Sequence, residues 1–228
     1  MSAPFQQYDQ TSRKMGIAVA IAALIAILAS NATGPAIWLH YLFKPLSTLL
    51  ILAQVWLTAS PVSSRYRSLL IVGLALSTCG DIFLMLPATV LASGFMCGLG
   101  SFLVAHLFFL RALTLDARLF GKPQAPVVYA AIGLINLLIL WPTLPADLRI
   151  PVTVYLVCLT AMAAQAASRW LTLGTTSSSL AACGGALFVL SDTIIAYDRF
   201  SHPVALAAVW ILGSYYAALW LLALSARQ

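Results

Sequence analysis

Eight apolar segments follow one another along the chain, separated by short stretches that contain polar residues and prolines. A membrane-spanning helix needs about 20 mainly apolar residues, and helices tend to end near proline. The pattern therefore predicts a bundle of about eight transmembrane helices. The predicted helices cover residues 15–30, 36–58, 68–86, 89–113, 127–141, 150–167, 180–197 and 204–224.

Composition supports a membrane location for the whole chain. Hydrophobic residues make up 62% of the 228 residues and charged residues only 8%, whereas soluble domains carry about 25% charged residues. We expect an all-α polytopic bundle that forms a single transmembrane domain over residues 1–228. The first segment follows Arg13 and Lys14 as in a signal peptide. Because further spans follow at once and no convincing cleavage site precedes them, we interpret it as an uncleaved span.

The net charge of +6 is explained by membrane topology rather than by nucleic acid binding, since the basic residues are spread over short loops. Nine of them fall on one side of the predicted bundle and two on the other. The positive-inside rule then places both termini in the cytoplasm. An integral protein of a bacterial inner (cytoplasmic) membrane fits this pattern. The nine are Arg13, Lys14, Arg65, Arg67, Arg111, Arg118, Lys122, Arg169 and Arg227; the two are Arg149 and Arg199.

Two aspartates lie inside predicted spans. The chain has only six acidic residues, and two of them, Asp81 and Asp192, interrupt apolar segments. A carboxyl group at membrane depth is energetically costly and usually faces a functional interior. The third and seventh helices run in the same direction, and each aspartate lies about 8 Å below the predicted outer boundary at 1.5 Å per residue. We therefore predict that Asp81 and Asp192 share one level.

The second predicted helix carries a polar stripe. His40, Tyr41, Lys44, Ser47 and Thr48 are three or four residues apart and so share a helix face. Lys44 would lie roughly 12 Å deep. It could be a lysine that extends its charged end to the membrane surface, but that depth favours a functional or ion-paired role. Its natural partners are Asp81 and Asp192.

The remaining polar candidates allow two interpretations each. Ser77 and Thr78, one turn before Asp81, can bond either the carboxyl group or their own helix backbone. His106 is predicted far from the aspartates, toward the cytoplasmic side, where it either orients a neighbour or takes part in catalysis. Arg199 either pairs with Asp198 on the surface or binds a phosphate.

Other groups contribute less to the predicted chemistry. Tyr215 belongs to a polar and aromatic cluster on the last helix that we expect to line a cavity. The glycines of the fourth and seventh helices should allow close helix approach. The cysteines lack CxxC spacing and are interpreted as buried apolar side chains. Neither a GxSxG, HExxH or P-loop motif nor a zinc signature is present, so we expect no metal.

Five local patterns, in order, carry a resemblance to a known family. The chain resembles the YhhN-like lysoplasmalogenases, which are eight-span membrane proteins, over nearly its whole length. One departure is visible: the family pattern has a glutamine shortly after the tyrosines of the last helix, where this chain has Ala217 to Trp220, and this leaves substrate choice open. The patterns are Lys44-Pro45-Leu46; Gly80-Asp81 with Leu84; Phe95, Gly98, Ser101, Phe102 and His106; Gly184, Phe188, Ser191, Asp192, Arg199 and Phe200; and Tyr215-Tyr216.

The resemblance implies hydrolysis of the vinyl ether of a lysoplasmalogen, without a cofactor, to a fatty aldehyde and glycerophospho-ethanolamine or -choline. Vinyl ethers are cleaved by protonation at carbon, and water then attacks the resulting oxocarbenium ion. This chemistry needs one protonated and one ionised carboxyl group, and burial and mutual repulsion of two carboxyls can provide both. We expect Asp81 and Asp192 to be these catalytic groups, in roles that the sequence leaves unassigned.

The predicted partners are a lysophospholipid substrate and membrane lipids, and a homodimer is left open. A transporter or lipid-binding protein that uses the same buried Lys and Asp residues is the alternative. The predicted substrate-binding residues are Lys44, Arg199, Tyr41, Ser47, His106 and Tyr215.

Overall fold

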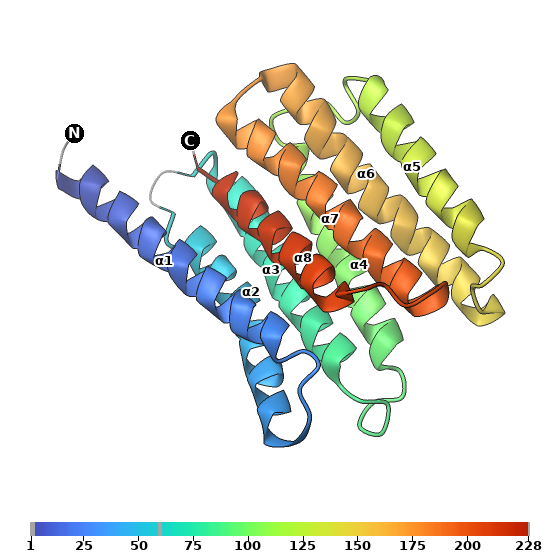
Figure 1. Cartoon of the computed structure of the whole chain (residues 1–228). Coiled ribbons are helices and arrows are strands. Elements are labelled where there is room, and N and C mark those ends of the chain that lie inside the picture. Colours follow the sequence, from blue (N-terminus) through green and yellow to red (C-terminus); the bar gives the residue numbers. More distant parts are fainter. Residues whose placement is uncertain (1–2, 59–60, 228) are drawn as a thin grey trace.

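The computed structural model describes residues 3–58 and 61–227, with side chains from Ser12 onward. These residues form eight α-helices and two short 3-10 helices, and a single isolated bridge joins Pro61 to Arg227. Figure 1 shows the arrangement. The elements are α1 (Ala3–Leu28), η1 (Gly34–Ala36), α2 (Ile37–Trp56), α3 (Ser64–Met85), α4 (Gly94–Leu113), α5 (Gln124–Leu140), η2 (Ala146–Leu148), α6 (Arg149–Leu173), α7 (Thr176–Phe200) and α8 (Ala207–Leu224).

Each helix coincides with one of the apolar segments, in the predicted order. The largest difference is at α1, which begins at Ala3 rather than at residue 15. Helices α6 and α7 each reach 25 residues and are also longer than the apolar pattern alone indicated. A tight turn joins the two helices, so that α6 continues to Leu173 and α7 begins at Thr176. Gly174 ends α6 in the left-handed conformation, with φ of 63°, and the Thr175 side chain caps α7 by accepting from the Ser178 amide at 3.2 Å.

The predicted count of eight membrane spans is not confirmed. Among the residues that the structure describes, six helical segments are long and apolar enough to cross a membrane, namely α2 with η1, α3, α4, α6 with η2, α7 and α8. Helix α5 is apolar but has only 17 residues. The chain is nevertheless an integral membrane protein with an all-helical polytopic fold.

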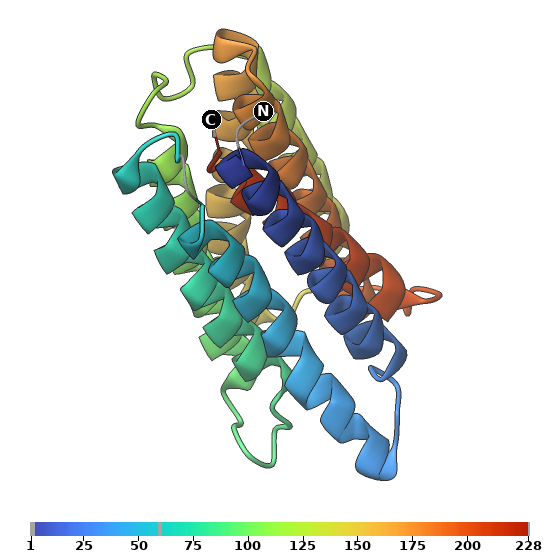
Figure 2. The ribbon, with the colours of Figure 1, turned by 90° about the vertical axis from the view of Figure 1, so that its left-hand side faces the viewer.

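Consecutive helices pack against one another except for α4 and α5, and contacts between helices farther apart in the sequence close the bundle. Helix α4 packs on α6, and α8 packs on α2 and also contacts α1 and α3. As a result, α3, α4, α7 and α8 lie in the centre, α1 lies at one edge and α5 at the other (Figure 1). The N- and C-terminal ends lie toward the same end of the bundle (Figures 1 and 2). This agrees with the prediction that both termini are on one side of the membrane, while the assignment of that side to the cytoplasm remains a prediction.

Glycines let the central helices approach closely, as the sequence predicted for the seventh helix and as Gly80 does on the third. A β-carbon at Gly80 would lie 2.5 Å from a ring carbon of Phe102, so α3 and α4 meet with a ring placed directly against backbone. A β-carbon at Gly184 would lie 2.9 Å from the carbonyl oxygen of Ala218, which brings α7 against α8. These contacts set the positions of Asp81 and of the last helix.

The bundle has apolar side chains on its outside and polar ones inside. Trp38, Val127 and Ile150 are exposed, as expected of a surface in contact with lipid. By contrast Lys44, Asp81, His106, Gln165 and Arg169 are buried. The expectation that the cysteines are buried is wrong for two of them, since Cys79 and Cys183 are exposed.

Candidate functional site

A cavity of about 120 Å³ lies among the central helices, and both intramembrane aspartates line it. Most of its wall is apolar, formed by leucine, isoleucine, valine and phenylalanine side chains. The sequence prediction that Asp81 and Asp192 come together is thus supported by a shared cavity. The polar side chains of the lining are Lys44, Asp81, Asn136, Tyr155, Asp192, Thr193 and Tyr215.

Asp81 on α3 is held by three side chains from two other helices. Its Oδ2 accepts hydrogen bonds from Thr48 Oγ1 and from Tyr215 Oη, each at 2.8 Å. Its Oδ1 lies 3.8 Å from Lys44 Nζ. Asp81 is only 2% exposed, so these partners replace the water that its carboxyl group would otherwise bind. Helices α2, α3 and α8 therefore converge on one buried ion pair.

Lys44 lies where the sequence placed it, deep on α2. The residue is buried, and Pro45 follows it within the helix. Proline cannot donate to the carbonyl four residues earlier, so the regular backbone bonding of α2 is interrupted beside the lysine. Tyr216 Oη donates to the Lys44 carbonyl at 3.4 Å. Of the two aspartates that the sequence suggested as partners of Lys44, the structure pairs the lysine with Asp81.

Asp192 on α7 has a different environment. Tyr155 Oη on α6 donates a hydrogen bond to Asp192 Oδ2. In the part of the chain that the structure describes, no protein group bonds to its Oδ1 and no cation pairs with it. The two aspartates thus differ in kind, because Asp81 faces an ammonium group and Asp192 faces a neutral phenol.

His106 on α4 completes a chain of side chains behind Asp192. Its Nε2 lies 3.1 Å from Tyr155 Oη. Since that hydroxyl donates to Asp192, it accepts from the histidine, which fixes the proton of a neutral imidazole on Nε2. The Nδ1 atom is buried without a hydrogen-bond partner, and the ring packs edge-on against Phe188 with centroids 4.6 Å apart. The prediction that His106 lies far from the aspartates is wrong, because Tyr155 connects it to Asp192.

Three other predicted site residues lie outside the cavity lining. Arg199 is exposed, and its guanidinium carbon lies 4.1 Å from the ring centre of Phe95, which does line the cavity. Arg199 thus lies at the outer mouth, and its alternative partner Asp198 instead accepts from the Val204 amide at 2.9 Å. Tyr41 packs edge-on against Trp38. Ser47 donates to the Phe43 carbonyl of its own helix at 2.8 Å. The substrate-binding roles of Tyr41 and Ser47 therefore gain no support from the cavity.

The neighbours of Asp81 on its own helix are also structural. Ser77 and Thr78 bond back to the carbonyls of Gly73 and Leu74, each at 3.0 Å, rather than to the carboxyl group. This resolves the two interpretations left open by the sequence in favour of the backbone.

Sequence reasoning missed one central residue, Tyr155. It is a tyrosine in an apolar segment with no polar neighbour one turn away to single it out. Thr48 was recognised only as part of the polar stripe on the second helix, and Asn136 was not recognised at all. The signal that could have identified Tyr155 is its position on a span otherwise dominated by aliphatic residues.

Comparison with known proteins gives a family and curated relatives. The sequence model of the YhhN family matches residues 39–226. A Mycobacterium tuberculosis protein named "Lysoplasmalogenase" is 37% identical over 209 residues, covering 89% of this chain and 76% of the relative. The human "Lysoplasmalogenase TMEM86B" is 34% identical over 201 residues, covering 84% and 76%. An Escherichia coli "Uncharacterized membrane protein YhhN" is 28% identical over 178 residues, covering 78% and 81%. No solved structure matches this chain.

Proposed function

Because the chain belongs to the YhhN family, we propose that it is a lysoplasmalogenase. It hydrolyses the vinyl ether of a lysoplasmalogen to a fatty aldehyde and a glycerophospho-alcohol. The names of relatives that are 34–37% identical over most of the chain support this activity. The observation that carries the proposal is the pair of aspartates, Asp81 and Asp192, in one mainly apolar cavity.

The reaction begins with proton transfer to carbon. Protonation of the vinyl carbon remote from the ether oxygen gives an oxocarbenium ion, which water attacks to form a hemiacetal. An acid that is neutral in the resting enzyme must supply this proton. Asp192 fits this role, since its only described partner is the neutral hydroxyl of Tyr155 and an apolar environment disfavours a charge that has no counter-ion. General acid catalysis of this kind contributes about 10²–10⁴-fold.

Asp81 fits the complementary role of the ionised carboxylate. The ammonium group of Lys44 and the hydroxyl donors of Thr48 and Tyr215 all stabilise negative charge on it. A carboxylate in the cavity stabilises the oxocarbenium ion and accepts a proton from the attacking water. Glycosidases use a similar division of labour between two carboxyl groups for a similar cation.

The proton balance closes without an outside donor. After the first stage Asp192 is ionised and Asp81 is protonated. Collapse of the hemiacetal then requires a proton on the departing glycerol oxygen and the removal of one from the hemiacetal hydroxyl. Asp81 gives the first proton and Asp192 takes the second, which restores both groups and releases the aldehyde and the glycerophospho-alcohol. No metal or cofactor takes part in these steps.

The other polar residues support the two carboxyl groups. Tyr215 holds the carboxylate of Asp81, and Tyr155, backed by His106, orients Asp192. Arg199 at the outer mouth is suited to the substrate phosphate, because a guanidinium group matches phosphate geometry. The substrate is a lysophospholipid drawn from surrounding membrane lipids. We assign the chain to a bacterial cytoplasmic membrane.

The test is incubation of the purified protein with a 1-alkenyl lysophospholipid and, in parallel, with the saturated 1-alkyl lysophospholipid of the same chain length. Aldehyde should form from the alkenyl lipid only. Absence of aldehyde in several detergents and in liposomes, together with movement of the intact lipid across liposome membranes, would contradict the enzyme and favour the transporter.

A further inference from the structure

The catalytic cavity is too small to hold a whole lysolipid. Its volume is about 120 Å³, whereas pockets that enclose a drug-sized ligand measure about 300–1,000 Å³. The cavity therefore has room for the reacting atoms and little more. Under the proposed function, the long alkyl chain of the substrate must leave the cavity between two helices.

A second hollow adjoins the cavity at the required place. It measures about 330 Å³, lies between α5 and α6, and shares Leu137 and Leu156 with the catalytic cavity. We call it the α5–α6 groove. Its other lining residues include Phe120, Pro126, Ala130, Gly133, Thr160 and Ala164. The shared leucines place the groove directly beside the catalytic cavity.

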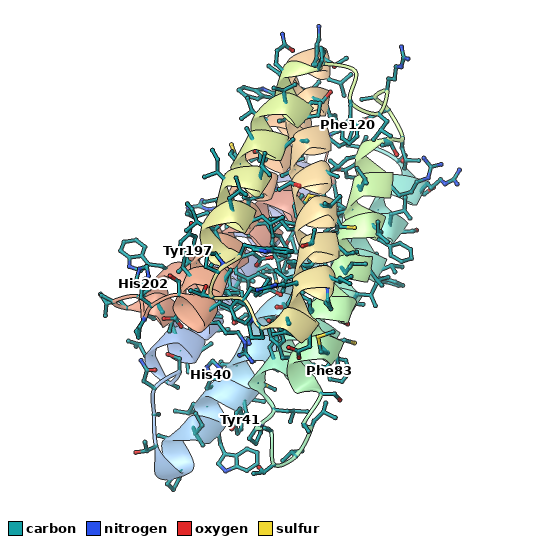
Figure 3. All side chains as sticks on the ribbon, turned by 90° about the vertical axis from the view of Figure 1, so that its right-hand side faces the viewer. His40, Tyr41, Phe83, Phe120, Tyr197 and His202 are labelled. Atoms are coloured by element: carbon teal, nitrogen blue, oxygen red, sulfur yellow. The ribbon has the colours of Figure 1, made fainter. Side chains whose placement is uncertain are left out.

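The groove leads away from the outer mouth of the cavity. On α5 its lining runs from Leu137 back to Pro126, eleven residues or about 16 Å at 1.5 Å per residue. Phe120, at its far part, lies toward the upper end of the bundle in Figure 3, well above the level of Tyr197. Arg199 thus lies at one end of the site, and the groove begins beside the level of the aspartates and extends away from Arg199 along α5 and α6. A lysoplasmalogen has the same order of phosphate, vinyl ether and alkyl chain.

The groove surface is hydrocarbon even where its residues are polar. Thr153 donates to the Arg149 carbonyl at 2.6 Å and Thr160 to the Leu156 carbonyl at 2.7 Å, so both hydroxyls are satisfied within α6. Gly133 brings the helices together, since a β-carbon there would lie 3.2 Å from the Thr160 methyl group. Such a surface suits a chain of methylene groups and offers nothing to a headgroup.

We propose that the α5–α6 groove binds the alkyl chain of the lipid substrate, and that its length sets the preferred chain length. This inference rests on the proposed function and extends it from the reacting bond to the rest of the substrate. The chain enters the groove between Leu137 and Leu156 and follows α5 toward Pro126. The aldehyde product leaves by the same lipid-facing opening.

Two adjacent alanines on α5 provide a matched test. Ala130 lines the groove and Ala131 does not, and both are exposed. Ala130→Phe should shorten the usable groove, while Ala131→Phe adds the same side chain to the lipid-facing surface. Each displaced methylene costs about 0.8 kcal/mol, or roughly fourfold in affinity. In Ala130→Phe, kcat/KM for a hexadecenyl substrate relative to an octenyl substrate should fall at least about tenfold, and in Ala131→Phe the ratio should stay at the wild-type value. Equal ratios in the two variants would overturn the proposal.

A labelling experiment separates this inference from the activity itself. A saturated ether lysophospholipid with a diazirine near the end of its chain cannot be hydrolysed, and on irradiation it should label α5 and α6 in wild type and in Ala131→Phe but not in Ala130→Phe. If the wild-type protein releases no aldehyde but is labelled in this pattern, the proposed enzymatic function is refuted while the binding of the alkyl chain in the α5–α6 groove is supported. Label on other helices in an active enzyme would refute the groove alone. Equal labelling by a diacyl phospholipid with the same diazirine would assign the groove to bulk lipid and also refute the proposal.

Discussion

Replacement of Lys44 by methionine tests the division of roles between the two carboxyl groups. Methionine keeps much of the length and the apolar character of the side chain but removes the ammonium group. Lys44 Nζ lies 3.8 Å from Asp81 Oδ1, and at about this distance unit charges attract by about 4 kcal/mol when the effective dielectric constant is about 20. Without that attraction Asp81 loses most of the stabilisation of its negative charge and takes up a proton.

The expected result is a large fall in kcat with little change in KM. A free energy of about 4 kcal/mol corresponds to roughly 10³-fold. Because Thr48 and Tyr215 still donate to Asp81, we expect a fall of about 10²–10³-fold. Thr48→Val is the matched control, because it removes one hydroxyl donor at 2.8 Å from the same carboxylate and leaves the charge pair. A hydrogen bond to a charged group is worth about 1.5 kcal/mol at the low end, so this variant should lose roughly tenfold.

The assay is steady-state aldehyde release from an alkenyl lysophospholipid, on variants that elute as a single species and keep their helical circular dichroism. A Lys44→Met enzyme with wild-type kcat and a raised KM would refute the reasoning, since it would show that the lysine binds the phosphate rather than sustaining the carboxylate. A smaller loss in Lys44→Met than in Thr48→Val would refute it as well.

Three further predictions follow from the same contacts. Tyr155→Phe should lower kcat by about tenfold, because Asp192 loses a hydrogen bond worth roughly 1–1.5 kcal/mol; an unchanged kcat would remove Tyr155 from the site. Turnover in D₂O should leave one deuterium on the aldehyde carbon next to the carbonyl, seen by mass spectrometry after immediate reduction, and its absence would exclude protonation at carbon. Asp116→Asn should lower the free energy of unfolding by about 3 kcal/mol, because it leaves buried Arg169 without its bidentate partner, whereas Asp147→Asn, at an exposed position, should have little effect in the same denaturant titration.

The aspartate pair and its lysine were predictable because membrane depth constrains them strongly. A charge inside a span must face the interior, and helices that run in the same direction bring equal depths together. Those two rules are enough to predict that Asp81, Asp192 and Lys44 face the interior of the bundle. They do not decide which aspartate receives the lysine, because that depends on whether α2 lies closer to α3 or to α7. In the structure α2 packs on α3.

The environment of Asp192 was not predictable from such rules. His106 lies twelve residues inside α4 and Asp192 eight residues inside α7 from their outer ends, a difference in depth of roughly 6 Å. The tyrosine side chain of Tyr155 spans that difference. The position of Tyr155 between His106 and Asp192 depends on the packing of α6 against both α4 and α7. Helices α4 and α6 are not neighbours in sequence, and no periodicity within one segment encodes their contact.

The number of membrane spans is a second feature that the sequence pattern predicts only in part. Apolar length located all eight helices, yet α5 has only 17 residues and is shorter than the six helical segments that are long and apolar enough to cross a membrane in the described part of the chain. Helix α5 is apolar, but 17 residues at 1.5 Å per residue span only about 25 Å, less than the roughly 30 Å of a bilayer's hydrocarbon core. Composition therefore predicts the number of helices more securely than the number of membrane crossings.

The central claim is that Asp192 protonates the vinyl ether in the cavity it shares with Asp81. The most direct test is aldehyde release from a 1-alkenyl lysophospholipid by Asp192→Asn, an isosteric change that removes the acidic proton and keeps an acceptor for Tyr155. The account predicts a loss of about 10²–10⁴-fold in kcat, in a protein whose thermal unfolding stays close to that of wild type. Turnover by Asp192→Asn at a rate near that of wild type would contradict it.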